Sequence, residues 1–248
     1  MPGTRTETAP LPVQQPPEGT TQPQPDVPLT IAEPDGSARG GIVVLHEARG
    51  VTEDVLWLVR VLADEGWLTV APHLYHRDTA EPDVEQDTAA ERVASLSGAT
   101  VLADCDGAFA WLARRGIDAD RIGVVGFDSG GSVALVVAAS RSIGAAVSVA
   151  GGGIVERLSD GLPALVEAAP ALACPWLGLY GEDDPLIPLE HVEALREAAM
   201  RSDVATDVVT YGGVGHRVDV VSDDPGGDDP GGTDALRRVL GWFDSHLR

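Results

Sequence analysis

The chain has 248 residues, a net charge of −22 and a hydrophobic fraction of 44%. This length suits one large α/β domain or two small ones, and the apolar fraction is enough for a full core. The charge argues against a nucleic-acid partner, because phosphate recognition needs clustered Lys and Arg. The longest apolar runs are too short to cross a bilayer, and the N-terminus lacks an apolar stretch typical of signal peptides, so we expect a cytoplasmic protein.

The N-terminal segment differs in composition from the rest of the chain. Residues 1–26 are rich in Pro, Gln, Thr and Glu and hold almost no large apolar side chain. Such a segment buries too little surface to offset its ordering entropy, so we expect a disordered tail. From residue 27 apolar segments alternate with amphipathic ones, which predicts one folded domain over residues 27–248.

The first predicted elements alternate between strand and helix. Residues 41–46 form a continuous apolar run, typical of a strand buried on both faces. After Thr52, whose side chain suits a helix cap, apolar residues recur at helical spacing, namely Val55, Leu58, Val59 and Leu62. Residues 67–71 predict the next strand. A second helical stripe ends before Gly116 and consists of Val101, Cys105, Ala108 and Leu112.

The second half of the chain continues this alternation. Strands are predicted at residues 121–126, 145–150, 176–180 and 208–211, and helices at residues 130–140, 188–200 and 235–247. Strands separated by helices of this length make βαβ units, so we expect an α/β fold with a mainly parallel central sheet. In such a sheet the functional side chains gather beyond the carboxyl ends of the strands.

The segment GFDSGG at residues 126–131 carries the strongest chemical signal. A strand runs into a sharp turn and a helix of small residues follows, which is the setting of a nucleophile elbow. In that frame Gly126 and Gly130 flank Asp128 and let the strand and the helix approach closely. The alternatives are an ordinary Gly-rich turn and a dinucleotide site. The glycines do not match G-x-G-x-x-G in frame, which argues against the dinucleotide site.

Two later turns complete the pattern. Asp184 lies in a tight turn directly after the strand at residues 176–180, where a carboxylate can orient a histidine. His216 lies in a short Gly-rich loop after the last predicted strand. The order of elbow, acid and histidine is the one that α/β-hydrolases use, so we expect Asp128, Asp184 and His216 to form the site.

At this point the chain resembles the dienelactone hydrolase family of α/β-hydrolases. The resemblance rests on His46-Glu47, on APHLY at residues 71–75, on GFDSGG, on the Asp184 turn and on Gly215-His216. It implies a mostly parallel sheet flanked by helices without a cap domain, and hydrolysis of a small ester- or lactone-like substrate without a cofactor or a metal.

The resemblance also implies roles for individual residues. A glutamate at the position of Glu47 holds the resting nucleophile in that family. Its oxyanion hole falls on the backbone N–H groups of Ala48 and Ser129, because one donor follows the nucleophile and one comes from the loop after an early strand. The elbow residue is usually a Cys and sometimes a Ser, and here the chain departs from the pattern with Asp128.

Asp128 leaves several mechanisms open. Other α/β-hydrolases, which act on halides and epoxides, use an aspartate to attack saturated carbon through an ester intermediate, although the dehalogenases among them carry a cap domain. Carboxylate attack on an ester carbonyl instead gives a high-energy mixed anhydride. Alternatively, His216 acts as a base on water that Asp128 holds in place, or the chain is a binding protein without catalysis. A shifted frame with Ser129 as nucleophile would place bulky Phe127 where the turn needs a small residue.

Further expectations concern Glu47, the acidic loop and the partners. Glu47 either faces Asp128, so that two carboxylates titrate as a pair, or binds solvent or Arg49. Residues 223–232 repeat DDPGG and predict a solvated acidic loop, since the ligand spacing of an EF-hand is absent. We expect a small-molecule substrate and a monomer or small homo-oligomer.

Overall fold

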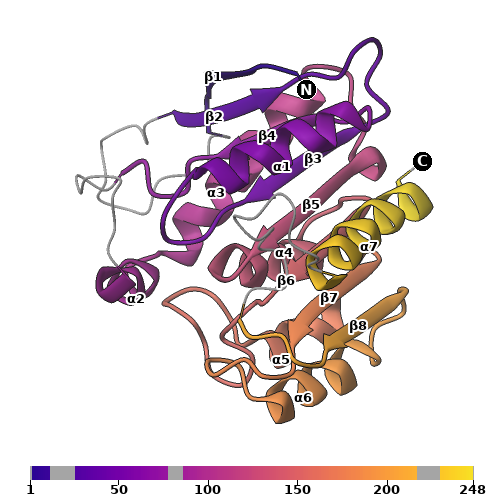
Figure 1. The fold of residues 1–248 in the computed structure, drawn as a ribbon. Helices are drawn as coiled ribbons and strands as arrows, with labels where there is room; N and C mark the ends of the chain where they lie inside the picture. The colour runs from indigo at the N-terminus through magenta and orange to yellow at the C-terminus, as the bar shows by residue number, and fades with distance from the viewer. Residues whose placement is uncertain (1, 12–25, 78–85, 217–229, 248) are drawn as a thin grey trace.

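An eight-stranded sheet forms the centre of the molecule (Figure 1). The computed structural model describes residues 2–11, 26–77, 86–216 and 230–247. The sheet order is β1-β2-β4-β3-β5-β6-β7-β8, with parallel pairing from β4 to β8 and antiparallel pairing of β1 with β2 and of β2 with β4. The strands are β1 (Thr4–Ala9), β2 (Val27–Ala32), β3 (Gly41–Leu45), β4 (Leu68–Pro72), β5 (Ile122–Phe127), β6 (Ala145–Val149), β7 (Trp176–Gly181) and β8 (Thr206–Tyr211). The predicted α/β-hydrolase architecture with a mostly parallel sheet is confirmed.

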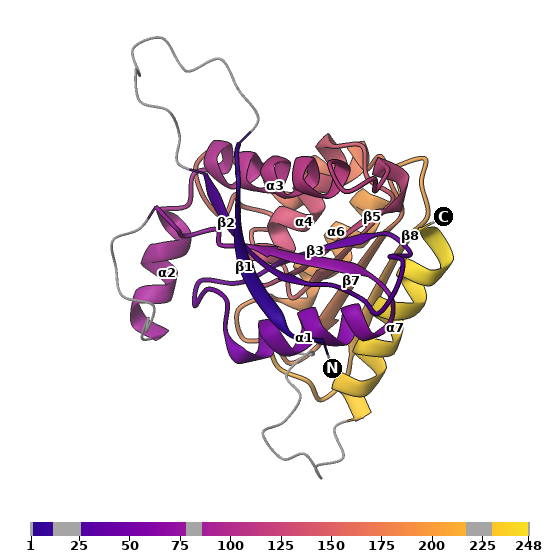
Figure 2. The ribbon, with the colours of Figure 1, turned by 90° about the horizontal axis from the view of Figure 1, so that it is seen from above.

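Helices cover both faces of the sheet (Figure 2). They are α1 (Glu53–Asp64), α2 (Gln86–Ala94), α3 (Gly98–Ala113), α4 (Ser129–Ser140), α5 (Leu165–Ala168), α6 (Leu189–Ala199) and α7 (Pro230–His246). Helices α1 and α7 share one apolar core with the sheet, and α3, α4, α5 and α6 share the other. The parallel strands are therefore buried on both faces, which explains their continuous apolar runs.

The predicted apolar stripe of α1 faces the sheet. Val55, Leu58, Val59 and Leu62 are all buried. The side chain of Thr52 accepts a hydrogen bond from the backbone N–H of Val55 at 3.5 Å and caps the helix as expected. Helix α4 differs, because small and apolar residues are buried all around it from Ser129 to Ala138. This burial holds α4 deep in the molecule, directly behind the end of β5.

The prediction of a disordered tail is wrong for residues 4–9. This polar segment forms β1, which pairs with β2 along its whole length. The side chain of Glu7 accepts hydrogen bonds from the Trp111 indole at 3.0 Å and from the Arg115 guanidinium at 2.8 Å. Pairing with a neighbour and anchoring to α3 supply the stability that the local sequence lacks. Residues 12–25 lie outside the described residues.

Three other segments bear on the sequence predictions. Helix α2 was not expected. Residues 223–229 of the acidic loop lie outside the described residues, whereas residues 230–232 belong to α7 and not to a loop. Between β6 and β7 the chain forms only the four-residue α5 and one 3-10 turn (Ala169–Ala171), so this segment forms no cap domain, as predicted.

A buried ion pair ties the segment after β4 to α3. Asp104 is fully buried and accepts two hydrogen bonds from the guanidinium of Arg77, both at 2.7 Å. The imidazole of His76 lies 3.3 Å from the same carboxylate. A carboxylate in this position needs its partners, because an unpaired buried charge costs several kcal/mol.

We therefore expect Asp104→Ala to lower the free energy of unfolding by about 3 kcal/mol, since it leaves Arg77 without its buried counter-charge. Asp106→Ala is the matched control on the same helix: Asp106 pairs with Arg141 at 2.7 Å but is partly exposed, so its loss costs about 1 kcal/mol or less. Urea denaturation of both variants measures the difference. Equal effects of the two substitutions would contradict the assigned role of the buried pair.

Candidate active site

Asp128 occupies a strained turn between β5 and α4. Its backbone has φ 50° and ψ −119°, a conformation that costs a non-glycine residue about 1–3 kcal/mol. The Asp128 N–H donates to the Val149 carbonyl at 2.9 Å, and the Asp128 carbonyl accepts from the Ser132 N–H at 3.1 Å. These bonds hold the turn in the sharp conformation of a nucleophile elbow and present the Asp128 side chain at the carboxyl edge of the sheet.

The two glycines that flank the elbow leave no room for side chains. A Cβ atom on Gly126 would overlap the carbonyl of Gly130, and one on Gly130 would overlap the carbonyl oxygens of Leu45 and His46. Strand β5, helix α4 and the end of β3 thus meet backbone to backbone. This close contact explains why the elbow requires small residues on both sides of Asp128.

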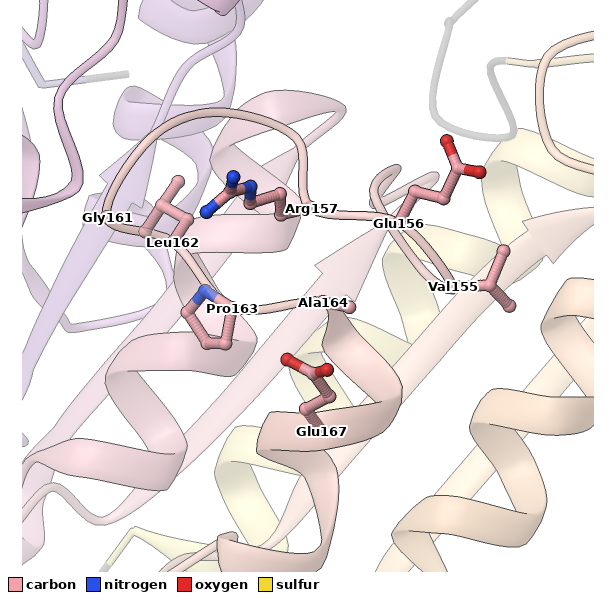
Figure 3. A pocket seen from close by; sticks show the side chains of 8 residues that line it. All are labelled: Val155, Glu156, Arg157, Gly161, Leu162, Pro163, Ala164 and Glu167. Carbon is pink, nitrogen blue, oxygen red and sulfur yellow. The ribbon is translucent and has the colours of Figure 1, made fainter.

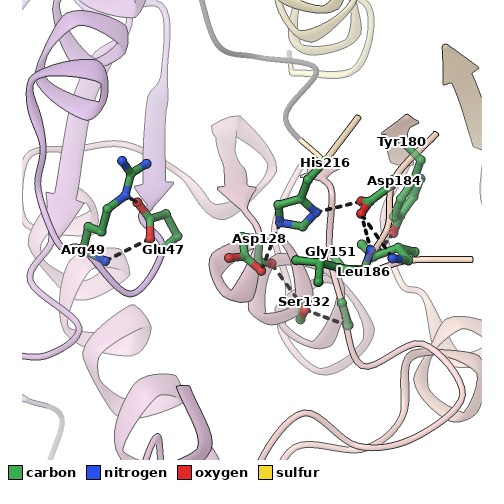
Figure 4. A network of polar contacts seen from close by, with 11 residues as sticks. Glu47, Arg49, Asp128, Ser132, Gly151, Tyr180, Asp184, Leu186 and His216 are labelled. Atoms are coloured by element: carbon green, nitrogen blue, oxygen red, sulfur yellow. Dashed lines mark hydrogen bonds and ion pairs between the residues drawn. The ribbon is translucent and has the colours of Figure 1, made fainter. Parts of the chain in front are cut away.

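Asp184 and His216 meet at the ends of β7 and β8 (Figure 4). His216 Nδ1 lies 2.7 Å from Asp184 Oδ2, and the Asp184 carboxylate is almost fully buried. Its other oxygen accepts the backbone N–H groups of Leu186 at 2.7 Å and Ile187 at 3.2 Å. Gly181 allows the His216 loop to cross the end of β7, because a Cβ there would overlap the loop backbone. Asp184 is therefore fixed by its own turn and orients the imidazole.

The other imidazole nitrogen faces Asp128. His216 Nε2 lies 3.8 Å from Asp128 Oδ1, which is an ion-pair distance and too long for a hydrogen bond. This nitrogen is buried and has no hydrogen-bond partner among the described residues. Asp128, with Asp184 acting in the same direction, outweighs the effect of burial and raises the pKa of His216 to about 9. At neutral pH the site thus holds an imidazolium between two carboxylates.

Glu47 does not face Asp128 in this structure. Its carboxylate accepts the backbone N–H of Arg49 at 2.9 Å and forms an ion pair with the Arg49 side chain. Figure 4 shows this pair separate from the cluster of Asp128, His216 and Asp184. Of the four side chains predicted for the site, the structure brings three together and places the fourth on the neighbouring turn, where it stabilises residues 47–50.

Two backbone N–H groups lie beside the elbow. Ser129 begins α4, so its N–H has no acceptor within the helix. In the part of the chain that the structure describes, the N–H of Ala48 also donates to no backbone or side-chain acceptor. The ends of β3 and β5 pair in register, Leu45 with Gly126, so the segments that carry both donors leave the sheet side by side.

Tyr75 and Arg92 are the neighbours of the site that sequence reasoning missed as functional groups. Burial raises the pKa of Tyr75 to about 12, while the Ser129 hydroxyl beside it acts in the opposite direction, and both hydroxyls are buried. The Arg92 guanidinium stacks 4.4 Å above the Tyr75 ring and donates to the Ala48 carbonyl at 2.9 Å. Arg92 lies on the unexpected α2, so no motif linked it to the site.

Within the described residues, the features away from the elbow add no further groups to the site. A hollow in the loop after β6 presents the charged side chains of Glu156, Arg157 and Glu167, and none of the predicted site residues lines it (Figure 3). Among the described residues, no cluster of three His, Cys, Asp or Glu side chains has an arrangement that could hold a metal ion. No helix in the described ranges combines the length and apolar character that crossing a bilayer requires.

Comparisons with known proteins agree with this architecture. The model of the dienelactone hydrolase family matches residues 27–247. A Salmonella typhimurium protein, assigned by name as a carboxymethylenebutenolidase, is 34% identical over 224 residues that cover 88% of this chain and 82% of that protein. A carboxymethylenebutenolidase of Rhodococcus opacus is 27% identical over 224 residues, with coverage of 89% and 87%. A Klebsiella pneumoniae crystal structure, assigned as a dienelactone hydrolase, superposes with a TM-score of 0.80 at 30% identity and covers 98% of this chain and 100% of its own.

The elbow predicts that alanine substitutions at two glycines differ sharply in their effect on stability. Gly126→Ala places a methyl group against the Gly130 carbonyl and should lower the unfolding free energy by about 3 kcal/mol or prevent folding, because backbone cannot move aside cheaply. Gly152→Ala is the control, since its Cβ would meet only the Leu158 side chain at 3.7 Å. Thermal unfolding of both variants measures the effect. A Gly126→Ala protein as stable as the control would contradict the described contact.

The pKa of His216 predicts how stability depends on pH. A histidine whose pKa is raised from 6.5 to about 9 stabilises the fold fully below pH 6.5, and this contribution is lost as the pH rises through 9. Asp128→Asn removes the largest cause of the shift. The difference in Tm between wild type and Asp128→Asn, measured from pH 6.5 to 9.5, should therefore shrink as the pH rises.

An exposed carboxylate far along the chain supplies the control for this titration. Asp203→Asn changes the same charge on the loop before β8 and should shift Tm equally at both ends of the pH range. A difference between wild type and Asp128→Asn that stays constant with pH would show that Asp128 does not hold the proton on His216.

Proposed function

The chain belongs to the dienelactone hydrolase family and is a hydrolase, and we propose that it opens a small lactone or ester at Asp128, His216 and Asp184. The observation that carries this proposal is the position of His216, bonded to Asp184 at 2.7 Å and facing the Asp128 carboxylate at 3.8 Å. We assign the oxyanion hole to the N–H groups of Ala48 and Ser129, which lie beside this cluster without acceptors.

The names of the relatives suggest the class of substrate. A carboxymethylenebutenolide is an unsaturated lactone with an exocyclic double bond on the ring. When the ring oxygen is attached to such a double bond, hydrolysis expels an enolate, which is a far weaker base than an alkoxide. We propose a lactone or ester of this activated kind for the present chain, because a site without a thiol or hydroxyl nucleophile needs a good leaving group.

We propose that Asp128 acts on water and does not attack the carbonyl itself. If a carboxylate adds to an activated ester, the adduct expels the carboxylate again in preference to the more basic enolate. Water bound to Asp128 avoids this reversal, because the tetrahedral adduct that it forms expels the enolate in preference to the more basic hydroxide. The side chain of Asp128 is about one third exposed, which leaves room for such a water.

The protons balance without any further group. Asp128 takes one proton from water as its oxygen adds to the acyl carbon, and the two N–H groups stabilise the oxyanion. The imidazolium of His216 gives its Nε2 proton to the departing oxygen. Asp128 then returns its proton to His216, since the imidazole is the stronger base of the pair. The product of lactone hydrolysis is the ring-opened acid, which carries the released oxygen as an enol or hydroxyl group.

Isotope labelling separates this mechanism from a covalent one. A single turnover of an enol lactone in heavy-oxygen water should produce acid that carries the label and leave the Asp128 peptide unlabelled in mass spectrometry. Label in the Asp128 carboxylate would instead establish an ester or anhydride intermediate, as expected of enzymes that act at saturated carbon. No turnover across lactone, ester, halide and epoxide panels would favour a binding protein.

Substitutions at the elbow provide the matched variants. Asp128→Asn should lower kcat by about 100-fold or more through loss of the base. Ser129→Ala should retain kcat within about threefold, because only the backbone of Ser129 takes part. Asp128→Cys should hydrolyse esters through an acyl-enzyme on the thiol, since His216 and Asp184 then face a nucleophile that forms a thioester. A Ser129→Ala protein as inactive as Asp128→Asn would move the nucleophile to Ser129 and overturn the assignment.

The proposal also covers the location, the domain content and the partners of the enzyme. We propose a cytoplasmic enzyme with a small-molecule substrate and no nucleic-acid partner, as a monomer or small homo-oligomer. It has one catalytic domain, whose sheet includes residues 4–9 as well as strands from residue 27 onward. The family match over residues 27–247 supports a single domain. The net charge of −22 supports the absence of a nucleic-acid partner.

A further inference from the structure

His46 is a buried histidine at the end of β3 that takes no part in the proton transfers described above. It is 1% exposed. Its Nδ1 lies 2.8 Å from the carbonyl oxygen of Glu47, and its Nε2 accepts the backbone N–H of Leu74 at 3.1 Å. The ring thus joins the loop that leaves β3 to the loop that leaves β4, directly beside the elbow.

The contacts define where the imidazole carries its proton. The N–H of Leu74 needs a lone pair on Nε2, so the single hydrogen of the neutral ring is on Nδ1. Nδ1–H then donates to the carbonyl of Glu47. Burial lowers the pKa of His46 to about 4, so the ring stays neutral near pH 7 and keeps one donor and one acceptor.

The carbonyl that His46 binds belongs to the same peptide group as the N–H of Ala48. No peptide in the described residues is cis, so this C=O and this N–H point in opposite directions. Fixing the oxygen therefore fixes the direction of the N–H. The Glu47 carbonyl also accepts the N–H of Gly50 at 3.0 Å, which closes the turn, and Arg92 binds the Ala48 carbonyl.

The same turn lies against the start of α4. A Cβ on Gly130 would overlap the carbonyl oxygens of both Leu45 and His46, so the backbone that carries Ser129 touches the backbone that leads to Ala48. A small rotation of the Glu47–Ala48 peptide would therefore change the spacing of the two oxyanion donors. An oxyanion hole works only when its donors are held in place before the charge develops.

We propose that His46 is a positioning residue, whose Nδ1–H aims the Ala48 N–H at the oxyanion of the substrate. This role rests on the proposed function, since it presumes an acyl substrate beside Asp128. The Nδ1 hydrogen bond also draws charge toward the Glu47 oxygen and so makes the Ala48 N–H a stronger donor. The Nε2 contact with Leu74 fixes the tautomer and the orientation of the ring.

Two amide substitutions distinguish the roles of the two ring nitrogens of His46. The side-chain amide of His46→Asn reaches the place of Nδ1 and can still donate to the Glu47 carbonyl, whereas that of His46→Gln reaches the place of Nε2 and can accept only from Leu74. We expect His46→Asn to keep kcat within about threefold and His46→Gln to lower kcat about tenfold or more at unchanged KM. A loss of packing alone would affect both variants alike.

The outcomes distinguish this inference from the proposed function. Equal kcat values for the two variants, or a lower value for His46→Asn, would overturn the positioning role. Absence of lactone and ester turnover in the wild type would count against the proposed function itself. In that event, or if a variant fails to fold, the 15N shifts of the wild-type His46 ring decide: a proton on Nδ1 supports the inference, and a proton on Nε2 contradicts it.

Discussion

The contact of α4 with the ends of β3 and β5 is the constraint on which the site depends. Gly126 and Gly130 let three backbone segments meet without intervening side chains. That approach forces Asp128 into a positive φ and leaves the N–H of Ser129 at the open start of a helix. It also sets the place of the loop after β3, and hence of the second N–H group. A substitution that pushes these segments apart would therefore separate the carboxylate and both donors together.

The charge of Asp128 changes what the histidine can do. A neutral thiol or hydroxyl leaves its histidine neutral at rest, so that the ring begins the reaction as a base. Asp128 is a carboxylate, and with Asp184 it raises the pKa of His216 to about 9. The same three positions then begin the reaction with the proton already on the ring. In our proposal the carboxylate takes over as the base and the imidazolium serves as the acid, which reverses the usual roles within one geometry.

Much of the fold could be predicted because its signals are local. The spacing of apolar residues in α1, the apolar run of β5 and the small residues of α4 each follow from interactions within a few residues. The turns of Asp184 and His216 were predicted from their places after strands, and the structure places the His216 ring between the carboxylates of Asp184 and Asp128. Helix α2 and strand β1 have no such signal. Strand β1 forms because β2 offers a free edge, and because Trp111 of α3 and Arg115 just after α3 bind Glu7.

Glu47 shows most clearly where sequence reasoning reaches its limit. The sequence left open whether Glu47 faces Asp128 or binds solvent or Arg49, and the structure shows an ion pair with Arg49, which is only two residues away. Which partner a flexible side chain selects depends on a turn conformation that composition does not encode. The outcome matters for the chemistry, because the Glu47–Arg49 pair is close to neutral and adds little negative charge beside Asp128. The positive charge of His216 is thus balanced mainly by Asp128 and Asp184. Glu47 contributes instead through its backbone, where one carbonyl bonded to His46 directs the neighbouring N–H of Ala48.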